Sequence, residues 1–160
     1  MKDCLIRIDD RLIHGQILEA WIPHIMAMRI VVIDDDVAYD PFRETVIRMV
    51  VPKDIEIRIF STRQFIEENK DAMNNERTIF LFSNISDAVT LLKGGFVFDK
   101  LNLGNLCSSL PTQVFSTSVM VNAQDIEDIR YLLKAGISVE LQRTPTDKAI
   151  CVKSLLEDKV

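Results

Sequence analysis

The sequence changes from mainly apolar to mainly charged in the run Arg7-Ile8-Asp9-Asp10-Arg11-Leu12-Ile13-His14-Gly15-Gln16. Residues 4–8 form a short apolar segment that is typical of a buried strand, and Gly15 opens a segment, residues 16–21, with helical character. We therefore expect His14 in a strand-to-helix connection. In doubly wound α/β proteins such connections lie at the carboxyl ends of the strands, where ligands bind.

The residue types of this connection suit phosphate chemistry. Imidazole is a good nucleophile near neutral pH, and one ring nitrogen of His14 can carry a phosphoryl group. The planar guanidinium of Arg11 can bind phosphate oxygens. Asp9 or Asp10 can orient the imidazole or hold the arginine in place. Each of these residues has a task that is consistent with phosphoryl transfer.

Three further residues of the run are candidate phosphate ligands. Gly15 and Gln16 stand where a helix starts, and a helix N-terminus offers free amide donors to an anion. Arg7 lies within or at the end of the strand, where pairing with a carboxylate fits as well as phosphate binding. Spacing alone also fits a solvated loop histidine at position 14, because charged loops of this kind are common.

The whole chain alternates between predicted strands and helices. Apolar runs predict strands at residues 4–8, 29–33, 55–60, 78–82, 100–103, 119–121 and 138–141. Helix start signals precede residues 41–49, 63–70, 87–93 and 123–135. This alternation predicts one α/β domain over residues 1–160, with an open, mainly parallel sheet of about six to seven strands and helices on both faces.

The composition fits a single globular unit. With 160 residues and 48% apolar content, the chain can bury a core without disulfides or metal. Its 19 basic and 24 acidic side chains give a net charge of −5, spread along the chain, which argues against nucleic-acid binding through a basic surface. The 3 cysteines lie far apart and lack zinc spacing, which indicates a reducing compartment and no metal site.

The sequence gives no sign of a membrane-spanning segment. No apolar run approaches the ~20 residues needed to cross a bilayer, and the N-terminus lacks the apolar segment of a signal peptide. A Walker-type loop for ATP is also absent. We expect a cytoplasmic protein that needs neither a metal nor an organic cofactor.

The run from Arg7 to Gln16, followed by Trp21, closely resembles the opening of the IIB components of the mannose/fructose/sorbose family of the sugar phosphotransferase system. Similarity continues at residues 30–40, 51–52, 101–104 and 141–147. The resemblance implies a phosphotransferase whose His14 accepts a phosphoryl group from a phosphohistidine of a IIA protein. The phosphoryl group would pass to a sugar taken up through membrane IIC and IID subunits, which would hold the protein at the inner face of the membrane.

The chain departs from the family pattern after Gly104. The family usually has a second glycine after its Asn-x-Gly segment, whereas this chain has Asn105-Leu106-Cys107. Asparagine tolerates left-handed backbone geometry, so the turn can survive, but a bulkier loop would change the partner surface. This departure leaves open a regulatory role without sugar transport. The identity of the sugar and the formation of a homo-oligomer also stay open.

Asp34-Asp35-Asp36 follows the second predicted strand and suggests an alternative function. An acidic cluster at the carboxyl end of a strand resembles the Mg²⁺-binding aspartates of receiver domains, which are phosphorylated on aspartate. Receiver domains, however, place the acidic pair after the first strand and the acceptor after the third, where this chain has Ser61. Helix capping and solvation explain Asp35 and Asp36 better than metal binding does, whereas Asp34 is the candidate of this triplet for the cleft of His14. Ser61 is a further candidate for the cleft, and N-capping explains it just as well.

Overall fold

The structure is a computed structural model that describes residues 4–68 and 77–157. The strands are β1 (Leu5–Asp9), β2 (Arg29–Ile33), β3 (Glu56–Phe60), β4 (Thr78–Phe82), β5 (Lys100–Cys107), β6 (Gln113–Ser116), β7 (Val119–Val121), β8 (Ser138–Leu141) and β9 (Ile150–Cys151). The helices are the π-helix η1 (Gln16–Trp21) and the α-helices α1 (Ile22–Ile25), α2 (Asp35–Ala38), α3 (Pro41–Val50), α4 (Thr62–Glu68), α5 (Ile85–Lys93), α6 (Ala123–Lys134) and α7 (Val152–Glu157).

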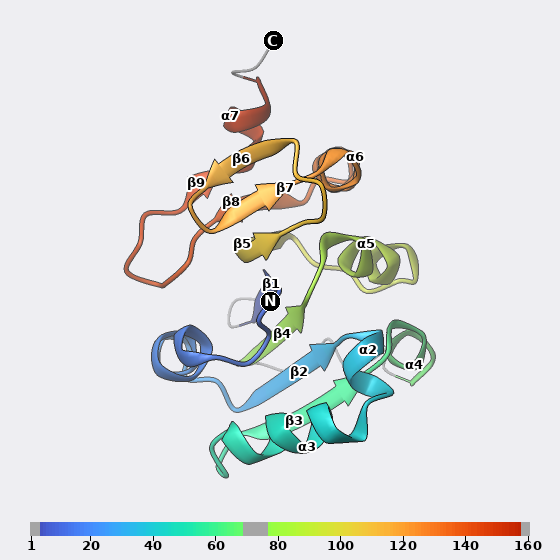
Figure 1. Cartoon of the computed structure of the whole chain (residues 1–160), viewed down its shortest axis with the longest axis vertical. Coiled ribbons are helices and arrows are strands. Elements are labelled where there is room, and N and C mark those ends of the chain that lie inside the picture. The colour runs from blue at the N-terminus through green and yellow to red at the C-terminus, as the bar shows by residue number, and fades with distance from the viewer. Residues whose placement is uncertain (1–3, 69–76, 158–160) are drawn as a thin grey trace.

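The strands of the described residues join in one sheet (Figure 1). Its main path runs β3-β2-β4-β1-β5-β7-β6, and β8 with β9 branches from β5. β8 pairs with the first half of β5, and β7 pairs with the end of β5. Within the described chain, the antiparallel pairs are β6 with β7 and β8 with β9. The prediction of an open, mainly parallel sheet is confirmed.

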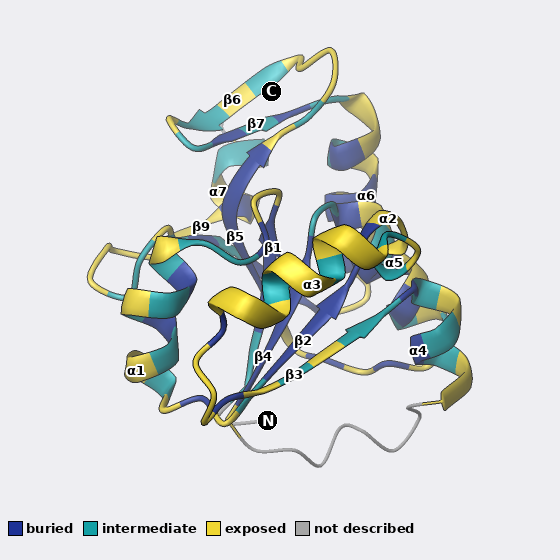
Figure 2. Cartoon of the chain, turned by 60° about the horizontal axis from the view of Figure 1, so that its bottom comes forward, coloured by how far each residue is buried: buried dark blue, intermediate teal, exposed yellow. Residues whose placement is uncertain are grey.

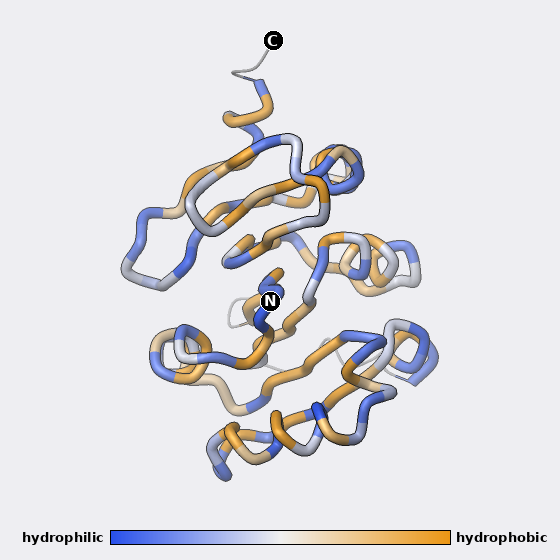
Figure 3. The backbone as a smooth tube through the Cα atoms, in the orientation of Figure 1, coloured by the Kyte–Doolittle hydropathy of each residue, from blue (hydrophilic) through white to orange (hydrophobic). Residues whose placement is uncertain are grey.

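Helices cover both faces of the sheet because the central strands are apolar on both sides (Figure 2). Ile30 and Val32 of β2 join one apolar cluster, and the alternate residues Val31 and Ile33 join the other. Side chains of η1, α1, α2 and α3 close the first cluster, and side chains of α4 to α7 close the second. Figure 3 shows the apolar residues concentrated along these strands. No helix in the described parts of the chain has the length and apolarity to span a bilayer.

The prediction of about six to seven strands was too low, since the described residues form nine. The two additional strands are β6 and β9, which pair antiparallel at the margins of the sheet. β6 has a polar residue at each end, and β9 is only 2 residues long, so neither has the apolar run that marks the other strands. β5 also continues past Leu103 to Cys107.

The predicted helices are confirmed with small shifts at their ends. α5 begins after Asn84, whose side chain accepts a hydrogen bond from the Asp87 N–H, rather than after Ser86. α6 begins after Asn122, as predicted. α4 starts at Thr62, and the predicted end of this helix at residues 69–70 lies outside the described residues. The segment at residues 16–21 is a π-helix, a wider turn that is frequent at functional sites.

The carboxyl ends of β1 and β5 are held together in an irregular register. Ile8 pairs with Leu103, but the next residue, Asp9, pairs with Asn105, so that Gly104 is skipped. Such irregularities re-aim side chains and are frequent beside active sites. Here the shift places Asn105 opposite Asp9.

Candidate functional site

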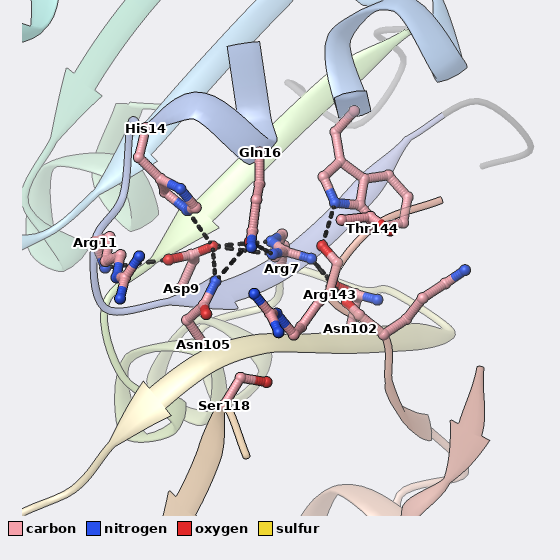
Figure 4. A network of polar contacts seen from close by, with 12 residues as sticks. Arg7, Asp9, Arg11, His14, Gln16, Asn102, Asn105, Ser118, Arg143 and Thr144 are labelled. Atoms are coloured by element: carbon pink, nitrogen blue, oxygen red, sulfur yellow. Dashed lines mark hydrogen bonds and ion pairs between the residues drawn. The ribbon is translucent and has the colours of Figure 1, made fainter. Parts of the chain in front are cut away.

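The carboxylate of Asp9, fully buried at the end of β1, is the centre of a polar network (Figure 4). Its Oδ2 lies 2.7 Å from Nε2 of His14 and accepts hydrogen bonds from Asn105 Nδ2 at 3.1 Å and from Arg7 Nε and Nη2 at 3.1 and 3.0 Å. Its Oδ1 accepts from the backbone N–H of Arg11 at 3.1 Å. One carboxylate therefore connects β1, β5 and the loop that carries the histidine.

Arg7 supports Asp9 from inside the protein. Its side chain is fully buried, and Nη1 donates to Asn102 Oδ1 at 2.7 Å and to the Gln142 carbonyl at 2.9 Å. Gly104 makes room for it, because a Cβ at position 104 would lie 2.0–2.5 Å from atoms of the guanidinium. Of the two interpretations of Arg7, the structure shows pairing with a carboxylate.

Opposing influences set the ionisation of this buried pair. Burial raises the pKa of Asp9, but the hydrogen bond with His14, the charge of Arg7 and the hydrogen bond from Asn105 together bring this pKa below its ordinary value of 3.8. Burial also lowers the pKa of Arg7, against the opposing effect of Asp9. The carboxylate is therefore ionised at neutral pH and places a negative charge beside the imidazole.

His14 lies at the mouth of this network, with 16% of its side chain exposed. Its carbonyl accepts from the N–H groups of Ile17 and Leu18, at 3.0 Å each, which joins the loop to η1. Because Nε2 faces Asp9, a hydrogen bond from Nε2–H to the carboxylate selects the tautomer with a lone pair on Nδ1. No group in the described part of the chain forms a hydrogen bond with Nδ1, so this nitrogen is available to an incoming group.

Arg11 is carried to the surface beside His14 by a tight turn. The Leu12 N–H donates to the Asp9 carbonyl at 2.9 Å, and Leu12 has a left-handed backbone with φ of 56°. The side chain of Arg11 is exposed and forms no hydrogen bond or ion pair with the described residues. Its guanidinium is therefore open to an anion.

Gly15 and Gln16 follow His14 and have different environments. Gly15 is exposed, and a Cβ there would meet no atom within 4 Å. Gln16 turns inward, where its Oε1 accepts from Asn105 Nδ2 at 2.9 Å and lies 3.4 Å from Arg7 Nη2. The side chain of Gln16 thus belongs to the network beneath His14, while Gly15 leaves the surface beside His14 open.

Asp10 is directed to β5 rather than to the imidazole. Its Oδ2 accepts from the Cys107 N–H at 2.8 Å, and its own N–H donates to the Asn105 carbonyl at 2.9 Å. Of the two carboxylates considered for orientation of His14, the structure brings Asp9 to the ring. Asp10 fastens the loop to the neighbouring strand.

The sequence predicts Asn105 in an altered turn. The structure instead places Asn105 within β5, without a left-handed backbone. Its side chain donates to both Asp9 and Gln16. The residue that follows Gly104 therefore makes two hydrogen bonds within the site. Sequence reasoning missed this role because the end of β5 was placed too early.

Arg143 is a further residue that the sequence analysis did not select. It follows β8, and its carbonyl accepts from Trp21 Nε1 at 2.9 Å. Its exposed side chain lines an open cleft of about 400 Å³ together with Arg11 and Ser118. Its positive charge contributes to the lowered pKa of Arg7. The sequence feature that could have pointed to Arg143 is its position just after a predicted parallel strand, where ligands of such sheets bind.

Asp34 and Ser61 lie at the carboxyl ends of β2 and β3 in a separate cluster. Asp34 accepts from Ser83 Oγ and caps α2, while Ser61 Oγ accepts from the Gln64 N–H at 3.1 Å. Among the described residues, no hydrogen bond or ion pair links either one to His14, and β4 separates β1 from β2. Capping accounts for both side chains. The described residues also contain no group of three or more His, Cys, Asp or Glu that could hold a metal ion.

Comparisons with known proteins match nearly the full chain to one family. A family model described as PTS system sorbose subfamily IIB component matches residues 4–160. The N-acetylgalactosamine-specific phosphotransferase enzyme IIB component 2 of Escherichia coli (strain K12) is 32% identical over 152 residues, covering 95% of this chain and 97% of the relative. The PTS system fructose-specific EIIB component of Bacillus subtilis (strain 168) is 34% identical over 148 residues, covering 92% and 91%.

Similarity extends to three dimensions and to longer proteins. The IIBSor domain of the sorbose permease from Klebsiella pneumoniae superposes with a TM-score of 0.87 at 28% identity, over 98% of this chain and 96% of that domain. The PTS system mannose-specific EIIAB component of Escherichia coli (strain K12) is 31% identical over 153 residues, which is 95% of this chain but 47% of the relative. The chain belongs to the sorbose subfamily of IIB components of the phosphotransferase system.

Proposed function

We propose that His14 is the phosphoacceptor of this phosphotransferase. It takes a phosphoryl group on Nδ1 from a phosphohistidine of a IIA protein and passes it to a sugar taken up through membrane IIC and IID subunits. The 2.7 Å contact between Nε2 and the buried carboxylate of Asp9 supports this proposal most strongly, because it leaves Nδ1 as the nucleophilic nitrogen.

The transfer step is an in-line displacement at phosphorus. The lone pair of His14 Nδ1 forms the new N–P bond while the N–P bond of the donor breaks, and its electron pair returns to the donor imidazole. The ring of His14 gains positive charge as the bond forms. The ionised carboxylate of Asp9, already in contact with Nε2–H, stabilises that charge without reorganisation.

Two exposed arginines supply positive charge for the phosphoryl oxygens. Arg11 lies on the same loop as His14, and Arg143 lines the same cleft as Arg11. Neither guanidinium forms a hydrogen bond or ion pair with the described residues, so both remain available to an anion. Gly15 leaves the approach to Nδ1 open for the donor.

The buried residues around Asp9 act as positioning residues. Arg7 and Asn105 hold the carboxylate, and Gln16 in turn accepts from Asn105. Each of these side chains has a hydrogen-bond partner, and together they orient the imidazole before the donor arrives. Asn105, which motivated the regulatory alternative, contributes to this network and so favours the carrier role.

The family relation supports a proposal for the donor and for the location. A mannose-specific relative is named as an EIIAB component and is about twice the length of the matched region, which supports a IIA protein as the phosphoryl donor. We place the protein on the cytoplasmic side of the membrane, where such a donor operates. The relatives are named for different sugars, including N-acetylgalactosamine, sorbose and fructose, and the membrane subunits are proposed to make that choice.

The test is phosphorylation of the purified protein by a reconstituted phosphoenolpyruvate relay with a cognate IIA protein. Wild type and His24→Ala are expected to acquire a label that is labile in acid and stable in base, whereas His14→Ala stays unlabelled. His24 is the matched control, since it is an exposed histidine outside the network. Label on His14→Ala, or label that is cleaved in base as an acyl phosphate is, would contradict the proposal and favour an aspartate acceptor.

A further inference from the structure

Helix α3 exposes apolar side chains in an unusual arrangement for a surface helix. Phe42 is 76% exposed and Met49 is 78% exposed, and Val46 and Val50 are exposed as well. None of the ten residues of α3 is buried, and Ile47 is its partly buried apolar residue. Figure 2 shows α3 lying on the sheet with most of its surface open to solvent, and Figure 3 shows apolar residues along it. A soluble protein seldom leaves such a face uncovered unless a partner binds it.

The exposed face of α3 borders the loop that carries His14. A groove of about 240 Å³ lies between them, with Arg11, Leu12 and Ile13 of the loop on one side and Phe42, Arg43 and Val46 of α3 on the other. The groove is thus built in part from the residues that directly precede the phosphoacceptor. A protein that brings a reacting atom to His14 therefore comes close to this groove.

The chemistry of the groove favours a partner that carries a phosphoryl group. An apolar centre of aromatic and aliphatic side chains with arginine at its edge is the usual composition of a protein–protein interface. Arg11 and Arg43 add positive charge, which attracts an anionic partner surface. A second copy of this chain fits poorly, because a two-fold interface centred on the groove would bring these arginines close to their own symmetry mates.

The two hollows beside the His14 loop differ in polarity. The cleft toward β7 is lined by polar groups, including Asp10, Ser118 and Arg143, and suits small polar groups such as phosphoryl oxygens or hydroxyls. The groove toward α3 is mainly apolar. A donor histidine is attached to its own backbone by a short side chain, so the donor's protein surface must approach closely, and an apolar groove next to His14 provides for that contact.

We propose that α3 and the His14 loop together form the docking surface for the protein that donates the phosphoryl group. Phe42 is the apolar anchor of this surface and Arg43 is its charged edge. The inference rests on the proposed function of His14, and it adds the surface that the donor recognises.

The test separates docking from chemistry by using two phosphoryl donors. Phe42→Ala and Arg43→Glu are compared with wild type for the rate of His14 labelling by phosphorylated IIA protein below saturation and by phosphoramidate, a small donor that needs no docking surface. Val97→Ala is the matched control, because Val97 is 67% exposed and lies before the amino end of β5, at the opposite edge of the sheet from His14. Urea unfolding confirms that each variant is folded.

We expect labelling by the IIA protein to slow about tenfold or more in both α3 variants, which is the effect of losing an interface anchor. Labelling by phosphoramidate is expected to stay at the wild-type rate.

Wild-type rates with IIA protein in both variants would overturn the inference. So would slowed transfer from phosphorylated His14 to sugar in vesicles with unchanged labelling by IIA protein, which would assign the surface to the membrane subunits. A wild-type dimer in gel filtration that dissociates in Phe42→Ala, with unchanged labelling, would assign it to a second copy. Absence of label on wild-type His14 with either donor would instead contradict the proposed function itself.

Discussion

Asp9 combines a structural and a chemical task in a single carboxylate. It compensates the buried charge of Arg7, and the same oxygen contacts Nε2 of His14. Removal of one partner of a buried ion pair strongly destabilises a protein, because the other charge stays buried without compensation. The residue that orients the phosphoacceptor is therefore also one on which the fold depends.

Asp9→Asn is expected to slow phosphoryl transfer to His14 about 100-fold, because the amide cannot stabilise the imidazolium and can favour the wrong tautomer. It is also expected to lower the free energy of unfolding by about 3 kcal/mol, since Arg7 keeps its buried charge. Rapid-quench labelling and urea unfolding measure the two effects. Asp10→Asn is the control, with less than about tenfold loss of rate, and equal losses in both variants would contradict the assignment of Asp9.

Arg143→Ala is expected to slow transfer about tenfold while leaving the free energy of unfolding within about 0.5 kcal/mol of wild type. The side chain is exposed and lacks hydrogen bonds to the described residues, so its removal affects the phosphoryl group rather than the fold. Rapid-quench labelling tests this rate. Arg130→Ala, which removes an exposed arginine on α6, should label at the wild-type rate. A wild-type rate in Arg143→Ala would show that Arg143 does not bind the phosphoryl oxygens.

At the scale of elements, the pairing of β1 with β5 builds the site. β1 ends at Asp9, which lies opposite Asn105 of β5, and the skipped residue Gly104 leaves the space that the Arg7 guanidinium fills. Substitution there should therefore act on the fold through Arg7, even though residue 104 has no side chain of its own.

Gly104→Ala is expected to destabilise the protein by about 3 kcal/mol, because the added Cβ would lie 2.0–2.5 Å from the buried guanidinium. Gly15→Ala is the matched control, since its Cβ would meet no atom within 4 Å, and its free energy of unfolding should change by less than about 1 kcal/mol. The shift of the urea midpoint measures both. Equal stability of the two variants would disprove the close packing of Gly104 on Arg7.

The elements also show where sequence-based prediction succeeds. β2 and β4 were predicted at their observed bounds because they are continuous apolar runs buried on both faces. β6 and β9 were missed because marginal antiparallel strands need no such run. His14 and Asp9 could be selected because they share one short run, whereas Asn105 and Arg143 reach the site through the order of strands in the sheet, which local spacing does not specify.

At the scale of the whole molecule, two carboxylates give the stability opposite dependences on pH. The pKa of Asp9 is below 3.8 in the folded protein, so its contribution is present above that pH and is lost as the pH falls. Burial raises the pKa of Asp87 from 3.8 to about 6, assisted by the charges of Asp34, Asp35 and Asp36 and opposed by the hydrogen bond from Asn84. Its contribution is present below 3.8 and is lost as the pH rises through 6.

Asp87→Asn is therefore expected to raise the melting temperature at pH 8, where the wild-type carboxylate is charged, and to leave it unchanged near pH 3.5. The asparagine can still accept a hydrogen bond from Asn84 in place of the carboxylate. Thermal unfolding of both proteins across this range measures the difference. A gain that is independent of pH would contradict the raised pKa.

The identity of the phosphorylated nitrogen tests the roles of His14 and Asp9 most directly. NMR of the ¹⁵N-histidine-labelled protein, before and after phosphorylation by the IIA relay, distinguishes the two ring nitrogens of His14. We predict a proton on Nε2 in the free protein, because Asp9 accepts from it, and phosphorus on Nδ1 in the phosphorylated protein. Phosphorus on Nε2, or on His24, would contradict the central role of the Asp9–His14 contact.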